Sequence, residues 1–479
     1  MKQYEATFDS LYGHEYPEWY RDAKLGFWSH WGLQSVPMTG DWYARNMYIE
    51  GTRQSLVHRS RYGHPSVFGY KDLIPLWKAE RFDPMALMER YAAAGGRYFM
   101  AQASHHDHFF NYDTAHSRFN SVQMGPHKDI CALWKQAADA HGLRFGISEH
   151  IAGSWTWTAV NKGHDTQGPY KDVPYDGRDP AYKDLYLDNY EHYYPDDPTR
   201  IDPWMTANKA WHAHWYTMVR EMIDRFSPEL FYSDNPLAFQ DKGYDMGLAA
   251  TAYLYNRSIE RNGENEAVYF IKEKRAPLYR VGVRDVEKSS LAGIAPWPWQ
   301  IDTSLADWFY DEEHPYKDPG HVIEILVDSI AKNGGLMINV PQRPDGTIDE
   351  TCGWVLDEIT HYTKTCGEGI FGTRPYRVYG EGTSGPTTAA YCEDRVNWTE
   401  MDTRFTQKDG TLYVHMMRTP ERRILTVRAL AAGEKVRRAR LLGGSGTLDF
   451  EQRLDGISIR LPEEMPTRYI NCVALEMEK

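Results

Sequence analysis

The chain has 479 residues, a formal net charge of −13 and an apolar content of 42%, which is typical of a globular protein with a large core. The acidic balance argues against a nucleic-acid partner, and no stretch is apolar enough to predict a membrane span. The five cysteines lack CxxC spacing, which argues against a zinc ribbon and a disulfide framework. The first residues lack the apolar segment of a signal peptide, so we expect a cytoplasmic protein, or a secreted one if a leader has been removed.

Short apolar runs alternate with longer amphipathic stretches from residue 24 to about residue 345. This alternation predicts parallel strands joined by helical crossovers, and the number of units favours an α/β fold with a (β/α)8-like barrel. The predicted strands are 26–30, 97–104, 143–148, 229–233, 267–271 and 335–340. The predicted helices are 84–94, 129–141, 206–226 and 321–332.

Beyond about residue 370 the pattern changes to short β-branched runs separated by Gly or Asp turns. The runs at 377–379, 411–415, 424–429, 436–442, 457–461 and 469–475 predict an antiparallel β-sandwich. We therefore expect a barrel domain over residues 1–368 and a sandwich domain over residues 369–479. No reactive cluster follows residue 370, so we expect the sandwich only to pack against the barrel.

Polar and aromatic clusters stand at or just after the ends of the first three predicted strands, where barrel enzymes place their reactive groups. These residues are His30, Trp31, Asp41, Trp42, His105, His106 and His150. Adjacent histidines converge poorly on one metal ion, which favours hydrogen bonds to hydroxyl groups and predicts no metal or cofactor. Carboxylates beside aromatic rings recur in sugar sites, because the acid accepts hydroxyl hydrogen bonds while the ring covers C–H surface.

Further carboxylates follow the later strands. Asp234 ends an apolar run, where it suits either a catalytic carboxylate or the N-cap of the next segment. Glycoside hydrolysis requires a second carboxyl group across the scissile bond, and Glu287 comes from the following strand region. Lys288 beside Glu287 fits an ordinary solvated surface equally well.

Taken together, six ordered segments resemble the motifs of the α-L-fucosidases of glycoside hydrolase family 29. They are 24–37, Asp41-Trp42-Tyr43, 104–109, 232–234, 331–348 and 370–376. The resemblance implies a retaining exo-acting α-L-fucosidase that cleaves fucosylated glycans through a covalent glycosyl-enzyme, without a cofactor. By position, Asp234 matches the nucleophile of the family. The expected sugar-binding residues are His30, Trp31, Asp41, Trp42, His105, His106, His150, Tyr232 and Trp299.

Four positions depart from the family pattern. Asp41 replaces the usual Glu, His108 replaces Gly, and Tyr232 stands where Trp is common. Gln300 occupies a place where many members carry the acid/base Glu, and an amide cannot usefully donate a proton. We therefore predict Glu287 as the acid/base, with two alternatives, Asp285 and Asp302.

Two other functions are left open by these departures. An α-L-galactosidase fits the same scaffold, because apolar pockets reject an added hydroxyl group only modestly. A carbohydrate-binding relative that has lost catalysis would explain Gln300 but not Asp234. We expect the long insertion 154–203 to set the preferred linkage and aglycone. The sequence predicts no oligomeric state.

Overall fold

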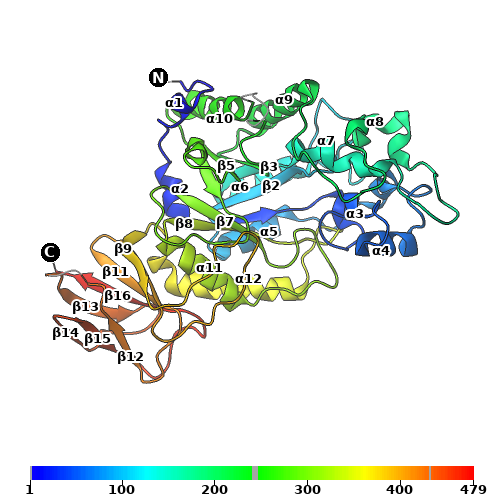
Figure 1. Cartoon of the computed structure of the whole chain (residues 1–479). Helices are drawn as coiled ribbons and strands as arrows, with labels where there is room; N and C mark the ends of the chain where they lie inside the picture. Colours follow the sequence, from blue (N-terminus) through cyan, green and yellow to red (C-terminus); the bar gives the residue numbers. More distant parts are fainter. Residues whose placement is uncertain (1–2, 240–245, 431–432, 479) are drawn as a thin grey trace.

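Eight parallel strands close into a barrel in the computed structural model, which describes residues 3–239, 246–430 and 433–478 (Figure 1). The strands are β1 (Leu25–Ser29), β2 (Tyr98–Ser104), β3 (Arg144–Glu149), β4 (Leu230–Ser233), β5 (Val268–Ile271), β6 (Val283–Asp285), β7 (Trp299–Ser304) and β8 (Gly334–Asn339). Pairing of β8 with β1, in which Leu336 lies opposite Leu25, completes the ring. The predicted (β/α)8-like fold is therefore confirmed.

Helices cover most of the outer face of the barrel. The longer ones are α5 (Pro84–Ala93), α6 (Ile130–His141), α9 (Lys209–Phe226), α10 (Met246–Asn262), α11 (Pro319–Ala331) and α12 (Glu350–Cys366). The shorter ones are α1 (Phe8–Leu11), α2 (Glu18–Ala23), α3 (Tyr43–Asn46), α4 (Arg53–Arg61), α7 (Ser154–Trp157) and α8 (Lys183–Tyr186). Of the described helices, none has the length and apolar character of a membrane span.

The helix boundaries follow from local chemistry. In α6, the Asp129 side chain accepts a hydrogen bond from the Ala132 N–H at the first turn, and Gly142 ends the helix at φ +69°. Between β5 and β6 the chain forms only the 3₁₀ turn η9 (Leu278–Val281), and residues 286–298 join β6 to β7 without a helix. The barrel is therefore less covered beside β6 than elsewhere.

Two barrel strands, β6 and β7, were absent from the predicted set. β6 has only three residues, which is too short for a clear pattern. β7 follows a proline-rich segment and carries mostly polar residues, although all six are buried. Buried polar groups at a strand end line a functional site and do not belong to the hydrophobic core. Hydrophobic periodicity alone therefore does not detect a strand that carries them.

Large side chains fill the barrel interior. Trp28, Tyr232 and Phe270 belong to one buried cluster inside the strands, and Tyr20 on α2 closes its amino-terminal end, where its ring lies 5.5 Å from that of Phe270. A packed interior leaves the carboxyl ends of the strands as the place for an open site.

The carboxyl-terminal part forms two antiparallel sheets. One has the strand order β13-β16-β11-β10-β9 and the other β12-β15-β14. The strands are β9 (Arg374–Glu381), β10 (Thr403–Lys408), β11 (Thr411–Met416), β12 (Ile424–Val427), β13 (Val436–Leu441), β14 (Phe450–Arg453), β15 (Gly456–Arg460) and β16 (Asn471–Met477). This confirms the predicted sandwich, although β10 and β14 were not predicted because their sequences are largely polar.

The two parts meet along α11, which packs against β9 and β10 (Figure 1). Asp328 on α11 lies 2.6 Å from Arg404 on β10 and 2.7 Å from Lys332, and all three side chains are at most 3% exposed. The connection between α12 and β9 contains the predicted boundary at 368/369, within the 3₁₀ turn Gly367–Gly369.

Candidate active site

A cavity of about 1030 Å³ opens at the carboxyl ends of the barrel strands. Most of the residues predicted from the sequence line it. These are His30, Asp41, Trp42, His105, His106, His150, Tyr232, Asp234, Asp285, Glu287 and Asp302. The closure of the barrel therefore brings together groups that lie up to 272 positions apart in the chain, from His30 to Asp302.

Two predicted sugar-binding residues, Trp31 and Trp299, do not line this cavity. Trp31 follows His30 and points to the opposite side of the chain, where its Nε1 donates to the Arg343 carbonyl at 3.0 Å. Trp299 opens β7 at the amino-terminal end of the barrel and donates to the Lys332 carbonyl. Both are buried structural rings, which corrects their expected role.

Asp234 stands one residue beyond β4 and faces the cavity. Its Oδ1 lies 2.5 Å from the Lys272 ammonium and its Oδ2 lies 3.3 Å from Nε2 of His106. Burial alone would raise the pKa of Asp234, but Lys272, His150 and His106 outweigh it and hold this pKa well below its usual range. The described partners of its carboxylate are the side chains of Lys272, His106 and Tyr232, so Asp234 acts as an ionised cavity carboxylate.

Lys272 is the central residue that sequence reasoning missed. It follows β5 directly, so the strand-end rule that identified Asp234 would have found it. Its ammonium contacts both Asp234 and Glu287. Burial alone would lower the pKa of Lys272, but the two carboxylates reverse that effect and raise this pKa well above its usual value. A permanent positive charge therefore sits between the two candidate catalytic groups.

Glu287 lies in the connection after β6, with its side chain 14% exposed. Besides the Lys272 contact, its Oε1 accepts a hydrogen bond from Nε1 of Trp308 at 3.1 Å. Because one ammonium contacts both carboxylates, the nearest oxygens of Asp234 and Glu287 are closer than the roughly 6.5–9.5 Å separation of an inverting pair.

Asp285 and Asp302 form a deeper acidic pair, at most 4% exposed. Tyr232 donates to Oδ2 of Asp302 at 2.9 Å, and Nε2 of Gln300 donates to Oδ1 of Asp285 at 2.9 Å. Burial and the mutual repulsion of the two carboxyls raise the pKa of Asp285 well above its usual range, and burial with the nearby Glu287 charge raises that of Asp302 to about 7. The two groups therefore share a proton near neutral pH. Gln300 itself is fully buried behind Asp285.

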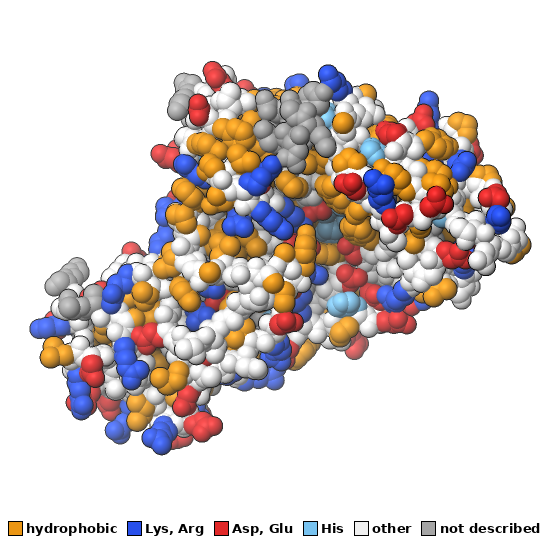
Figure 2. Space-filling view, viewed as in Figure 1, with side chains coloured by type: hydrophobic (Ala, Val, Ile, Leu, Met, Phe, Trp, Pro, Cys, Tyr) orange, Lys and Arg blue, Asp and Glu red, His pale blue; other side chains and the backbone are white. Residues whose placement is uncertain are grey.

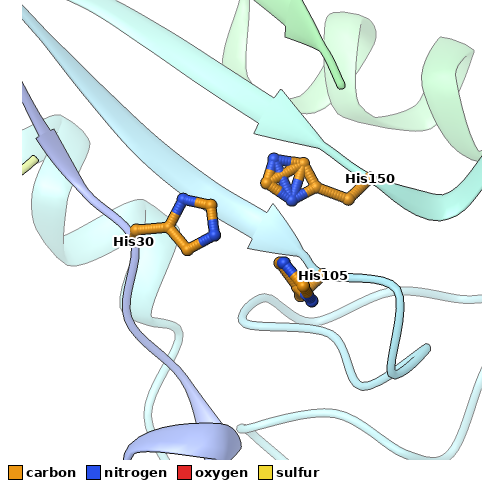
Figure 3. A group of neighbouring side chains, drawn as sticks. All are labelled: His30, His105 and His150. Atoms are coloured by element: carbon orange, nitrogen blue, oxygen red, sulfur yellow. The ribbon is translucent and has the colours of Figure 1, made fainter. Parts of the chain in front are cut away.

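Three imidazoles from three different strand ends converge on one side of the cavity (Figure 3). The ring nitrogens of His30, His105 and His150 include atoms within 4.8 Å of one another. Burial is the main cause that lowers the pKa of all three, so they are neutral near pH 7. Within the described residues, both ring nitrogens of His30 and of His150 have no hydrogen-bond partner. Such groups are available to a ligand.

The hydrogen bonds of the Gln34 side chain determine the tautomer of His105. The Oε1 atom of Gln34 accepts from the Ala44 N–H, so its Nε2 must donate to Nδ1 of His105 at 2.8 Å. The Nε2 of His105 therefore carries the proton and lies 3.7 Å from Asp41. A protonated nitrogen cannot ligate a metal, so this cluster suits hydroxyl groups better than an ion. The second group with metal-binding geometry, His106, His150 and Asp234, includes the ion-paired carboxylate.

Aromatic rings form the walls of the cavity. Trp42 and Trp204 stack nearly parallel, with centroids 6.3 Å apart at 15°, and Trp204 is fixed by its hydrogen bond to Oδ1 of Asn235. We expected the insertion 154–203 to set the preferred linkage and aglycone. None of its residues lines the cavity, whereas Trp204, directly after it, does. Flat rings beside hydroxyl-binding groups are typical of a sugar site.

The opposite rim comes from the carboxyl-terminal part. Thr388, Ala390 and Tyr391, in the connection between β9 and β10, line the same cavity. The expectation that this part only packs against the barrel is therefore wrong. Its sequence there has no catalytic pattern, because only the tertiary contact brings it to the site.

Comparisons with known proteins agree with this geometry. The family pattern described as Alpha-L-fucosidase matches residues 1–368. The tissue α-L-fucosidase of Rattus norvegicus is 24% identical over 97% of this chain and 89% of its own length, and that of Homo sapiens is 23% identical over the same shares.

Solved structures are similar over nearly the whole chain. The α-fucosidase of Thermotoga maritima, in complex with fucose, superimposes with a TM-score of 0.75 at 21% identity, covering 99% of this chain and 100% of that one. An α-L-fucosidase of Bacteroides thetaiotaomicron, solved as a trapped covalent intermediate, superimposes with a TM-score of 0.65 at 15% identity, covering 98% and 99%. At these identities the superpositions establish the fold, and the family match establishes the relationship: this chain belongs to the α-L-fucosidase family.

Proposed function

We propose that this protein is a retaining, exo-acting α-L-fucosidase that hydrolyses terminal α-L-fucosyl residues of glycans. The observation that carries this proposal is the ammonium of Lys272 between Asp234 and Glu287, at the base of a cavity lined with imidazoles and rings. This arrangement keeps one carboxylate ionised for attack and a second within reach of the same bond.

Asp234 is the nucleophile in this mechanism. Its carboxylate oxygen attacks the anomeric carbon and the bond from that carbon to the glycosidic oxygen breaks. Glu287, which must enter this step in its protonated form, gives its proton to the leaving oxygen. The positive charge that develops on the sugar ring in the transition state is favoured by the ionised Asp234.

The second step returns the enzyme to its starting state. Asp234 loses its charge when it becomes an ester, so Glu287 is then the remaining carboxylate partner of Lys272. As a carboxylate, Glu287 takes a proton from water while the water oxygen attacks the anomeric carbon. Fucose leaves with retained configuration.

The closed base of the cavity supports exo action. Trp28 and Tyr232, whose ring centroids are 4.7 Å apart, line the cavity and belong to the buried cluster that fills the barrel interior. The neutral imidazoles of His30 and His150 are available to its hydroxyl groups. An α-L-galactosidase remains the alternative that the assay must test.

The proposal is tested by release of nitrophenol from aryl α-L-fucoside and aryl α-L-galactoside. We expect turnover of the fucoside, and a loss of at least about 10⁴-fold in kcat for Asp234→Asn, because the amide cannot form the glycosyl-enzyme. Azide added to Asp234→Gly would yield a fucosyl azide of inverted configuration. A preference for the galactoside would change the substrate, and no turnover of either would favour a binding protein.

Glu287 is tested by leaving-group dependence. For Glu287→Ala we expect a large loss with a poor leaving group, a small loss of the first step with dinitrophenol, and rescue by azide with retained configuration. Matched variants are Asp285→Ala and Asp302→Ala. If Glu287→Ala loses the same activity on both leaving groups, Glu287 is not the acid/base. If Asp285→Ala or Asp302→Ala shows the larger loss with the poor leaving group, that residue is the acid/base.

A further inference from the structure

Four basic side chains line the cavity of Asp234, and they divide into two paired and two unpaired groups. They are Lys272, Lys274, Arg275 and Arg284. Lys272 contacts the catalytic carboxylates, and Arg275 lies 2.6 Å from Glu273. Within the described part of the chain, neither Lys274 nor Arg284 forms an ion pair with a carboxylate.

Arg284 owes its position to the missing helix beside β6. Val283 packs in the barrel interior, so the alternation of a strand places Arg284 on the outer face. A helix would normally cover that face, but the chain forms only η9 there, and the guanidinium lies 5.3 Å from the ring of Tyr279. Its Nε is buried and has no hydrogen-bond partner among the described residues. This donor is unsatisfied by the protein.

Lys274 stands two residues beyond Lys272, so its backbone is at most about 7 Å further out along the chain. Its ammonium lies 5.6 Å from the ring centroid of Tyr391, which is 64% exposed. Tyr391 is held near the barrel by Glu393, whose side chain accepts from Thr303 at 2.9 Å. The ring therefore reaches the cavity from an anchored segment.

Lys274, Arg284 and Tyr391 together form what we call the cationic rim. In Figure 2, Lys and Arg side chains gather beside a hollow in which histidine surface is visible. The chain carries 67 acidic and 54 basic residues, so unpaired cations at the mouth of an acidic cavity are not explained by overall charge. A rim that attracts anions therefore lines the same cavity as Asp234.

We propose that the cationic rim binds a negatively charged group, a sulfate ester or a carboxylate, on the sugar that carries the fucosyl residue. Lys274 and Arg284, which line the cavity without an ion pair to a described carboxylate, neutralise the anion. The exposed face of Tyr391 packs against the C–H surface of the same sugar. This inference rests on the proposed fucosidase activity and names its substrate class.

The test compares three α-L-fucosyl disaccharides that differ only in the second sugar: neutral, sulfated and carboxylated. The readout is the ratio of kcat/KM for each anionic substrate to that for the neutral one. The variants are wild type, Lys274→Gln/Arg284→Gln, and the control Lys171→Gln/Arg422→Gln. The control removes the same charge at exposed positions that do not line the cavity. Thermal unfolding checks that every variant is folded.

We expect a wild-type ratio well above one for at least one anionic substrate, falling at high salt. The rim variant should lower this ratio about tenfold, as expected for two partly exposed charge contacts, and the control should leave it unchanged. The substrate with the larger ratio of kcat/KM to the neutral one shows whether the rim binds a sulfate ester or a carboxylate. A wild-type ratio near one, or a ratio that survives in the rim variant, would overturn the inference while leaving the fucosidase proposal intact. Absence of turnover on all three would refute both.

Discussion

Replacement of Lys272 by Met tests whether the bridging ammonium acts through its charge. Met keeps most of the side-chain volume and removes the cation that contacts Asp234 and Glu287. Without that cation the pKa of Asp234 rises, and a protonated Asp234 cannot attack. The variant should therefore lose activity mostly at acid pH.

The magnitude follows from the contacts. Unit charges about 4 Å apart interact by about 4 kcal/mol at the dielectric typical of sites near a protein surface. Discounting this energy for the partial exposure of the pair, we assign about 2 kcal/mol to Asp234, which corresponds to a loss of about 30-fold in kcat/KM. Asp234 and Lys272 are each only 17% exposed, so salt should screen this effect weakly.

The assay is the pH profile of kcat/KM for aryl α-L-fucoside between about pH 4 and pH 8. Because Lys272 lowers the pKa of Asp234, its loss raises that pKa, and the acid limb of the profile should move to higher pH. Lys272→Arg keeps the charge and should leave the limb in place. An equal loss at every pH in Lys272→Met would refute the electrostatic reasoning and leave Lys272 a positioning role.

Two further predictions concern stability. Arg404→Met leaves Asp328 buried with only Lys332 as cation, so we expect a loss of about 3 kcal/mol in the free energy of unfolding, measured by urea denaturation. Arg437→Met removes an exposed pair and should cost at most about 1 kcal/mol; an equal cost would contradict the role of burial. Because the folded-state pKa of Asp302 is raised to about 7, the folded protein binds more protons than the unfolded chain between about pH 4 and pH 7, so stability falls as the pH rises through this window. Asp302→Asn should flatten that fall in melting temperature between pH 5 and pH 8, and an unchanged slope would show that this group does not titrate there.

The sequence by itself determined the barrel, the sandwich and most of the cavity. The barrel strands that were predicted are mostly apolar, almost wholly buried and separated by amphipathic helices, so local periodicity specifies them. Asp234 and His30 were recognised because a polar residue directly after a buried strand has one plausible place, the open end of the barrel. These features depend on neighbours along the chain.

The tertiary structure decided the rest. Neighbouring residues in an extended chain point to opposite sides, so Trp31 points away from the cavity while His30 faces it. The closure of the barrel buries Trp299 at its amino-terminal end. Lys272 acquired its role only when β5 and β6 placed Glu287 opposite it.

Tyr391 reached the site from beyond the barrel, through contacts that no local pattern encodes. The same holds for the proton shared by Asp285 and Asp302, which depends on two strands meeting in a buried environment. Pairwise distances across a closed sheet set the charge of each group, and such distances do not exist until the chain has folded.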